Sequence, residues 1–389
     1  MSIALPDVVR RCRAAVAAGL LGTIVSCLPP LTLASGVTVI HDFTGTGGTG
    51  KKPNGALVQA SDGGLYGTAW AGGAKRWGDV FKLTTTGSAT VVRSFKGQTG
   101  GNHPWAGLIL GKDGHLYGTT FEGAGDLDGT LFKVSLNGAL TVLHEFHVAD
   151  SLGASPNQRL LQASNGDIYG ISRDTTPCCG AAWRYRADGS IARIHAFTMA
   201  EGYEQSALVQ GNDGLIYGVA TVGGTFDRGT AFRMSADGSN FSVLHQFNWD
   251  NGNTSYPDSL MRAADGQFYG TAAYGGGYCG ALFRMDASGN VNVLYEFPID
   301  TYCGHPNGAL IQASDGNFYG VTSHGGAADI GTLYRMTPGG TVTVMHEFSG
   351  ADGSEPFGAL VQAGDGRLYG TTLAGGAHGN GTAFSFQIP

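Results

Sequence analysis

Residues 308–348 read GALIQASDGNFYGVTSHGGAADIGTLYRMTPGGTVTVMHEF and contain four short segments with the composition of β-strands. The segments are GALIQAS, NFYGVTS, GTLYRM and TVTVMHEF, and they are separated by stretches that contain Asp-Gly, Gly-Gly and Pro-Gly-Gly. Asp-Gly is a strong signal for a tight hairpin, because both residues tolerate the positive φ that such turns need. The stretch therefore predicts one antiparallel sheet of four short strands.

The same pattern recurs along the whole chain. The phrase DGxxYG returns at intervals of 48 to 52 residues, and the third copy, NGDIYG, departs from it. Its seven tyrosines are Tyr66, Tyr117, Tyr169, Tyr217, Tyr269, Tyr319 and Tyr369. Self-similarity at this period is typical of propellers and solenoids, in which each repeat is one supersecondary unit. The chain therefore contains seven such sheets.

The two ends of the repeat array decide between a closed ring and an open solenoid. The array begins with VTVIHDF, residues 37–43, which matches a fourth segment without the first three. It ends with GTAFSF, residues 381–386, which matches a third segment without a fourth. Pairing the two completes the seventh sheet and removes exposed sheet edges. The sequence predicts an all-β, seven-bladed β-propeller with four antiparallel strands per blade over residues 37–389, closed by the N-terminal strand.

Composition excludes several other classes of protein. Glycine supplies 66 of the 389 residues, more than twice its share of roughly 7% in average proteins. Charged residues make up only 14%, against roughly 25% in average proteins. Such a chain is a poor candidate for a helical bundle or a coiled coil. The net charge of -7, without clustered Lys and Arg, argues against a nucleic-acid surface. We expect no nucleic-acid partner.

The N-terminus has the layout of a secretory signal. Arg10, Arg11 and Arg13 precede an apolar stretch, residues 14–25, and small residues follow. The apolar stretch is too short to span a bilayer. We therefore expect residues 1–34 to be a signal peptide and the protein to be secreted, periplasmic or at the cell surface.

Two processing sites for this segment remain open. Thr-Leu-Ala at positions 32–34 offers small side chains to a signal peptidase, and cleavage there leaves Ser35 as the first residue. Ile-Val-Ser-Cys at positions 24–27 resembles a lipobox, in which Cys27 would become lipidated. The protein would contact a membrane only in the second case.

The repeat phrase is specific enough to indicate a family. The stretch ALxQAxDGxxYG, followed by a Gly-Gly loop, GTxF[KR] and VLHxF, resembles the GloVer tandem-repeat family of bacterial exported proteins. The resemblance runs through all seven repeats and implies a surface or secreted protein. It implies no reaction, cofactor or catalytic residue. The third repeat departs most, with GAAWRY in place of GTxF[KR] and no Gly-Gly loop.

Repeated residues lie at equivalent places around a ring, so we expect them to hold the fold. Five histidines share one position of the fourth strand: His41, His144, His195, His245 and His346. They lie one blade or more apart, whereas zinc ligands must converge within about 2 Å of one ion. We therefore expect a structural role for them, with no metal and no cofactor. The loop Asp126-Leu127-Asp128 has oxygen ligands for calcium but no complete binding-loop pattern.

Function should lie where the repeats differ. In an antiparallel blade, the loop between strands 2 and 3 and the loop from strand 4 to the next blade emerge on one face, and here these loops are long and variable. Aromatic and polar residues in or beside them suit a sugar or a protein ligand. The candidate binding residues are Trp77, Trp105, Trp249, Tyr256, Asp258 and Asn307. The alternative is that these side chains pack only on their own loops.

From the sequence we expect a non-catalytic, monomeric module that binds a glycan or another surface protein. The alternative is a polysaccharide hydrolase or lyase in which Asp258 works with Asp150 or Asp300, since propellers often assemble sites from single residues on several blades. No nucleophile, zinc or nucleotide motif appears in a suitable context.

Four cysteines follow the targeting segment. Cys279 lies in a loop between strands 2 and 3, and Cys303 lies in the loop that leaves strand 4 of the same repeat, so both project from one face. We expect a disulfide between them. The adjacent pair Cys178 and Cys179 either forms a vicinal disulfide or stays reduced.

Overall fold

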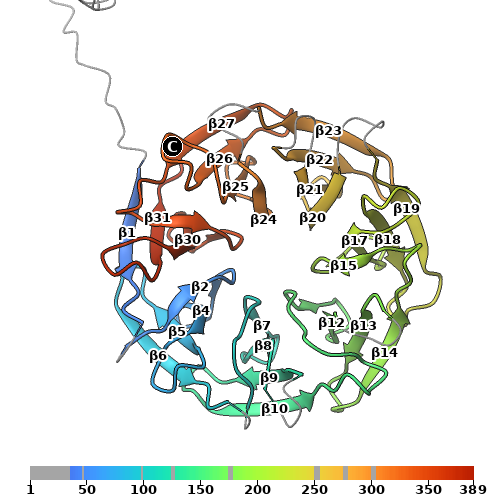
Figure 1. The fold of residues 1–389 in the computed structure, drawn as a ribbon, viewed down its shortest axis with the longest axis horizontal. Helices are drawn as coiled ribbons and strands as arrows, with labels where there is room; N and C mark the ends of the chain where they lie inside the picture. The colour runs from blue at the N-terminus through green and yellow to red at the C-terminus, as the bar shows by residue number, and fades with distance from the viewer. Residues whose placement is uncertain are drawn as a thin grey trace, which may run out of the picture. The chain divides into compact units, whose positions relative to one another are not determined.

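Seven antiparallel sheets, one for each repeat, make up the part of the chain that the structure describes (Figure 1). The structure is a computed structural model, and it describes residues 36–45, 48–97, 100–123, 128–173, 178–248, 255–274, 279–298 and 304–389. The sheets are the blades of a β-propeller, with their first strands nearest the central axis. The predicted fold is confirmed. No helix in these ranges is long and apolar enough to cross a membrane.

The first three blades each begin at the channel and end at the outer rim. Blade 1 contains β2 (Lys51–Pro53), β3 (Val58–Gln59), β4 (Leu65–Ala71), β5 (Asp79–Leu83) and β6 (Ala89–Ser94). Blade 2 contains β7 (Ile109–Leu110), β8 (Leu116–Thr120), β9 (Thr130–Val134) and β10 (Leu140–Glu145). Blade 3 contains β11 (Leu161–Gln162), β12 (Ile168–Ser172), β13 (Ala181–Tyr185) and β14 (Ile191–Ala196). In blade 1 the inner strand is divided into two pieces, which both pair with β4.

The remaining four blades repeat this order. Blade 4 contains β15 (Tyr203–Gln205), β16 (Val209–Gln210), β17 (Ile216–Val222), β18 (Thr230–Met234) and β19 (Ser242–Gln246). Blade 5 contains β20 (Ser255–Arg262), β21 (Phe268–Tyr274), β22 (Ala281–Met285) and β23 (Val291–Glu296). Blade 6 contains β24 (Pro306–Gln312), β25 (Phe318–Thr322), β26 (Thr332–Met336) and β27 (Val342–Glu347). Blade 7 contains β28 (Ser354–Pro356), β29 (Val361–Gln362), β30 (Leu368–Ala374), β31 (Thr382–Phe386) and β1 (Val37–Asp42).

Blade 7 is closed by the N-terminal strand. β1 pairs antiparallel with β31, and Val37 lies opposite Phe386 while Asp42 lies opposite Thr382. In Figure 1 the blue β1 lies beside the red β31. The predicted closure is therefore confirmed, and the outer edge of β31 is covered.

The DGxxYG phrase is a structural device within each blade. In blade 1, Asp62 Oδ1 accepts the N–H of Gly64 (3.0 Å) and Oδ2 accepts the hydroxyl of buried Tyr66 (2.7 Å). The same Tyr–Asp bond recurs in every blade except the third. There Asn165 donates to the hydroxyl of Tyr169 instead (3.2 Å). The carboxylate locks the hairpin turn to the following strand, so the motif belongs to the scaffold.

Aromatic pairs join neighbouring blades. In blade 1 the ring of Phe81 lies over Gly67, where a Cβ atom would come within 2.6 Å of the ring. The same ring meets the edge of Phe43, which follows β1, with centroids 5.0 Å apart. All seven blade interfaces have such a pair, at 5.0 to 5.5 Å. Offset and edge-to-face pairs are favourable for rings, so the core is a ring of inter-blade contacts.

Candidate functional site

One position at the start of each blade, in or just before its inner strand, has the same uncommon backbone conformation in all seven blades. The residues there have φ between 43° and 58° although none is glycine. They are Lys52, His103, Ser155, Glu204, Tyr256, His305 and Glu355. A non-glycine residue keeps a left-handed conformation only where the surrounding structure holds it. The chain thus enters every inner strand through one kind of turn, while the side chain at that turn differs between blades.

Backbone hydrogen bonds between blades hold these turns. The N–H of Lys52 donates to the carbonyl of Asn380 (2.9 Å), and the N–H of Glu355 donates to that of Ile330 (2.8 Å). In each case the acceptor lies in the loop between strands 2 and 3 of the preceding blade, and four more blades repeat the bond. The two kinds of long loop therefore meet at one mouth of the channel, as an antiparallel blade requires.

A cavity of about 180 Å³ lies at this mouth, and we call it the mouth pocket. Its lining residues come from all seven blades and lie in or next to the inner strand of each. In six blades the residue two places beyond the left-handed one lines the pocket: Asn54, Trp105, Asn157, Asp258, Asn307 and Phe357. Equivalent backbone positions thus present three amides, two aromatic rings and one carboxylate to a shared space.

Several polar groups of the mouth pocket have no partner in the protein. Asn54 is 3% exposed, and neither its Nδ2 nor its Oδ1 has a hydrogen-bond partner among the described residues. The same holds for Oδ1 of Asn157. A buried polar group left unpaired costs about 1–3 kcal/mol. Such groups in a pocket wall are suited to a polar ligand or to ordered water.

Arg159 is the cation of the mouth pocket. Its side chain reaches solvent inside the ring, where surrounding protein removes much of its hydration and lowers its pKa. The guanidinium still keeps its charge, because arginine is not deprotonated in proteins. No hydrogen bond or ion pair joins it to another residue in the described ranges. The pocket therefore contains a positive charge without a counter-charge in contact.

Asp258 is the one carboxylate among the described residues that line the mouth pocket. Its Oδ2 accepts the N–H of Gly308 (3.3 Å), which belongs to the inner strand of the next blade. Burial raises its pKa, because desolvation disfavours the charged form. This carboxyl can accept a hydrogen bond from a ligand hydroxyl and, when protonated, donate a hydrogen bond.

Aromatic rings extend from the mouth pocket across blades 1 and 2. Trp105 meets the edge of Trp70 with centroids 5.0 Å apart, and it meets Phe357 of blade 7 at 6.1 Å. Trp70 stacks on His103 (4.4 Å), and His103 in turn contacts Trp77 (5.5 Å), which is 41% exposed. We call Trp70, Trp77, His103 and Trp105 the aromatic shelf. It connects the pocket to the outer part of the same face.

The structure brings together part of the predicted binding set. Trp105, Asp258 and Asn307 line the mouth pocket, whereas Trp77 lies at the far end of the aromatic shelf. Tyr256 does not line the pocket, because its hydroxyl accepts a hydrogen bond from Nη1 of Arg228 (2.5 Å) and its ring lies against that guanidinium. Trp249 lies outside the described residues, so its role stays a prediction.

Arg159 and Phe357 line the mouth pocket but were not predicted from the sequence. Arg159 stands where the other six repeats have Ala, Gly or Ser, within the third repeat, whose departures had been noted only in later segments. Phe357 stands where Asn54 and Asn307 stand in their repeats. In both cases a departure from the repeat next to an inner strand was the available signal.

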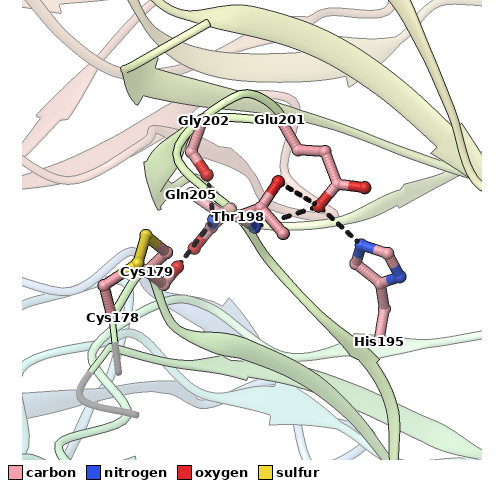
Figure 2. Close-up of a disulfide and its surroundings, with 7 residues drawn as sticks. All are labelled: Cys178, Cys179, His195, Thr198, Glu201, Gly202 and Gln205. Carbon is pink, nitrogen blue, oxygen red and sulfur yellow. Dashed lines mark hydrogen bonds and ion pairs between the residues drawn. A yellow bond between two sulfur atoms is a disulfide. The ribbon is translucent and has the colours of Figure 1, made fainter. Parts of the chain in front are cut away.

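The adjacent cysteines form a disulfide near this mouth. Cys178 is bonded to Cys179, which resolves the alternative left open by the sequence (Figure 2). The buried side chain of Gln205 donates to the carbonyls of Cys179 and Gly202, both at 3.0 Å. The disulfide turn of blade 3 is thereby tied to the start of the inner strand of blade 4.

The second predicted disulfide is only partly visible. Cys279 is fully buried and disulfide-bonded. Its predicted partner, Cys303, lies outside the described residues, as do Cys27 and the rest of the targeting segment. The pairing of Cys279 with Cys303 therefore stays a prediction.

Two of the repeated histidines have acidic partners close by in their own blades. Nε2 of His195 pairs with Glu201 (3.2 Å), as Figure 2 shows, and Nε2 of His346 pairs with Asp352 (2.7 Å). Within the described ranges no three His, Cys, Asp or Glu residues are grouped as metal ligands. In the loop considered for calcium, Asp128 accepts the N–H of Val148 (2.8 Å), and Asp126 lies outside the described residues.

Fold and site together define a seven-bladed β-propeller with a polar and aromatic pocket at one mouth of its channel. The profile of the Gloeobacter/Verrucomicrobia repeat matches residues 18–177 and 158–384. The chain therefore belongs to the Gloeobacter/Verrucomicrobia repeat family, as the repeats had indicated. No curated protein matches the sequence.

Solved structures share the fold. The virginiamycin B lyase of Staphylococcus aureus superposes with a TM-score of 0.60 at 13% identity, over 87% of this chain and 96% of the lyase. A proposed 6-phosphogluconolactonase of Bacteroides fragilis gives 0.52 at 17% identity, over 82% of this chain and 86% of its own. A proposed 6-phosphogluconolactonase of Bacteroides uniformis gives a TM-score of 0.52 at 16% identity, over 82% of this chain and 87% of its own. At these identities the likeness shows the propeller fold alone.

Proposed function

We propose that the protein is an exported, non-catalytic binding module that holds a glycan at the mouth pocket and the aromatic shelf. The observation that carries the proposal is that amides without partners and partly exposed aromatic rings occur together at one mouth. Sugars present hydroxyl groups and apolar C–H faces. Amides and carboxylates bind the first, and aromatic rings cover the second.

The size of the pocket supports a chain end as its ligand. A cavity of about 180 Å³ is smaller than the roughly 300–1,000 Å³ of typical small-molecule sites. It suits one sugar ring, and the aromatic shelf beside it supplies contact area for the next sugars. A protein ligand would need about 800 Å² of buried surface on each partner, so its footprint would extend far beyond the pocket.

The chemistry of the pocket favours binding over hydrolysis. Glycosidases use two carboxyl groups, roughly 5 to 10 Å apart. Asp258 alone among the described carboxylates lines the mouth pocket. Asp150 lies on an exposed loop, where its backbone N–H donates to the carbonyl of His147 (2.8 Å). Asp300 lies outside the described residues. Export is supported by the arginine-rich leader and the small residues that follow it.

Capture on a glycan array and on a surface-protein array tests the proposal. Trp105→Ala should weaken glycan capture about tenfold or more, because it removes the ring shared by the pocket and the shelf. Asn54→Ala should weaken capture without lowering the melting temperature, because the amide has no hydrogen bond to lose within the described protein. Phe226→Ala is the control, since this ring is 50% exposed and lies outside both features.

Three results would overturn the proposal. They are glycan capture unchanged by both pocket variants, capture of surface proteins but no glycan, and turnover of a polysaccharide that Asp258→Asn abolishes.

A further inference from the structure

We infer that the glycan bound at the mouth pocket is acidic, and that a carboxylate of this glycan binds Arg159. The inference rests on the proposed function and names the ligand class of the same site. It starts from a cation that the propeller scaffold does not explain.

Arg159 breaks the repeat at a position that faces the channel. The equivalent residue is small in the other six repeats: Ala56, Gly107, Ala207, Ser259, Ala309 and Ala359. All six line the mouth pocket together with Arg159. Six blades fold with a small side chain here, so the arginine is not needed for blade structure. Its guanidinium has no partner in the described ranges.

The charge pattern of the channel favours an anion. Arg159 lines both the mouth pocket and a deeper channel cavity of about 900 Å³. Among the described residues that line this deeper cavity, the charged ones are Lys112, Arg159 and Arg262, and none is a carboxylate. The protein as a whole carries a net charge of -7. A positive channel with apolar walls focuses its field on an anion that enters it.

Of the three described cations that line this channel, Arg159 is the one without a hydrogen bond to the described protein. Nζ of Lys112 donates to the carbonyl of Ser164 (2.9 Å), and Nη1 of Arg262 donates to Oδ1 of Asn212. Both cations are thus satisfied at least in part by the protein. Arg159 retains all five of its N–H donors. A bound anion would supply the acceptors that the protein does not.

A carboxylate matches this environment better than a phosphate. The planar guanidinium binds a carboxylate through two parallel hydrogen bonds and neutralises its single charge. A phosphate carries more charge and would face one guanidinium with Asp258 in the same pocket. Asp258 is better matched by a hydroxyl group, which the rest of a sugar ring provides. A uronic acid offers both groups, and its ring can lie against Trp105.

Matched polymers test the inference. Binding of the full-length protein is measured by calorimetry to polygalacturonate, alginate and hyaluronate, each beside its own methyl ester, and to dextran sulfate. We expect one of the three acids to bind at least tenfold more tightly than its ester. Arg159→Ala, which installs the residue found in four other repeats, should weaken that binding about tenfold to hundredfold. Arg159→Lys keeps the charge without the planar fork and should give a smaller loss.

A control variant separates the specific contact from net charge. Arg193→Ala makes the same change in charge on the exposed outer strand β14, and it should leave binding unchanged. Equal binding of an acid and its ester, or equal binding of dextran sulfate, overturns the carboxylate assignment. Failure of all three acids, with neutral glycans captured on the array, overturns the inference and leaves the proposed function standing. Capture of no glycan at all overturns both.

Discussion

Asp79 should make the stability of the protein fall as pH rises. This residue begins β5 at the position occupied by Thr130, Thr230, Thr332 and Thr382 in other blades. It is fully buried, its Oδ2 accepts the N–H of Gly50 (2.8 Å), and its Oδ1 has no partner among the described residues. Burial outweighs that single hydrogen bond and raises the pKa of the carboxyl from 3.8 to about 7.

The sign and size of the effect follow from this pKa. Below about pH 4 the carboxyl is protonated in both the folded and the unfolded chain, so its ionisation does not lower the free energy of unfolding. Between about pH 4 and pH 7 the folded protein retains a proton that the unfolded chain has lost, and the free energy of unfolding falls as pH rises. Above pH 7 the loss is complete. A difference of about 3 pKa units corresponds to at most about 4 kcal/mol, at 1.36 kcal/mol per unit.

Asp79→Asn should remove this pH dependence, because an amide of the same shape can accept the Gly50 N–H without a charge. At pH 8 we expect the variant to be more stable than the wild type by up to about 4 kcal/mol, and at pH 4 the two should be equal within about 1 kcal/mol. Urea unfolding from pH 4 to pH 9 measures the difference.

Asp237→Asn provides the control, because bonds from Ser239 lower the pKa of this exposed carboxyl and its titration is over before pH 5. An Asp79→Asn benefit that is constant with pH, or that grows toward acid, would refute the reasoning.

Three further outcomes are expected. Intact mass of the protein from its host should show a chain that begins at Ser35 or a lipid on Cys27; a chain that retains the leader in the cytosol would contradict export. Deletion of residues 37–43 should lower the melting temperature and promote aggregation, because β31 then has an open edge; an unchanged, monomeric ring would argue against closure by this strand. Peptide mapping without reduction should recover Cys279 joined to Cys303, and two free thiols would disprove the pair. In the chain-entropy model this bond stabilises the folded protein by roughly 3 kcal/mol.

The fold could be predicted from the sequence because similar turn and strand signals recur in all seven repeats. Each Asp-Gly pair indicates a hairpin, and each Tyr-Gly pair supplies a glycine on which an aromatic ring lies and, in six of the seven blades, a tyrosine that the turn carboxylate holds. The unmatched segments at residues 37–43 and 381–386 then determined how the ring closes. These are local features, or features of order along the chain, so periodicity was sufficient.

The site could be predicted only in part, because it depends on distances across the channel. Periodicity identified the face, and unrepeated aromatic or polar residues pointed to Trp105, Asp258 and Asn307. It could not show that Tyr256 is engaged by Arg228, since this contact depends on the left-handed turn at Tyr256 and on a loop of the preceding blade. Arg159 was not among the predicted residues, because it lies just before β11 and not in a long loop.

Constant backbone and variable side chains coincide at the mouth of the channel. Left-handed turns there are expensive to maintain in non-glycine residues, yet all seven blades have one, held in most blades by a bond to the preceding blade. Such a frame fixes where each following side chain points, whatever its chemistry. Asn54, Trp105 and Asp258 therefore enter the mouth pocket from equivalent backbone positions. A change at these positions alters the chemistry of the pocket wall, while the backbone hydrogen bonds that hold the turns stay in place.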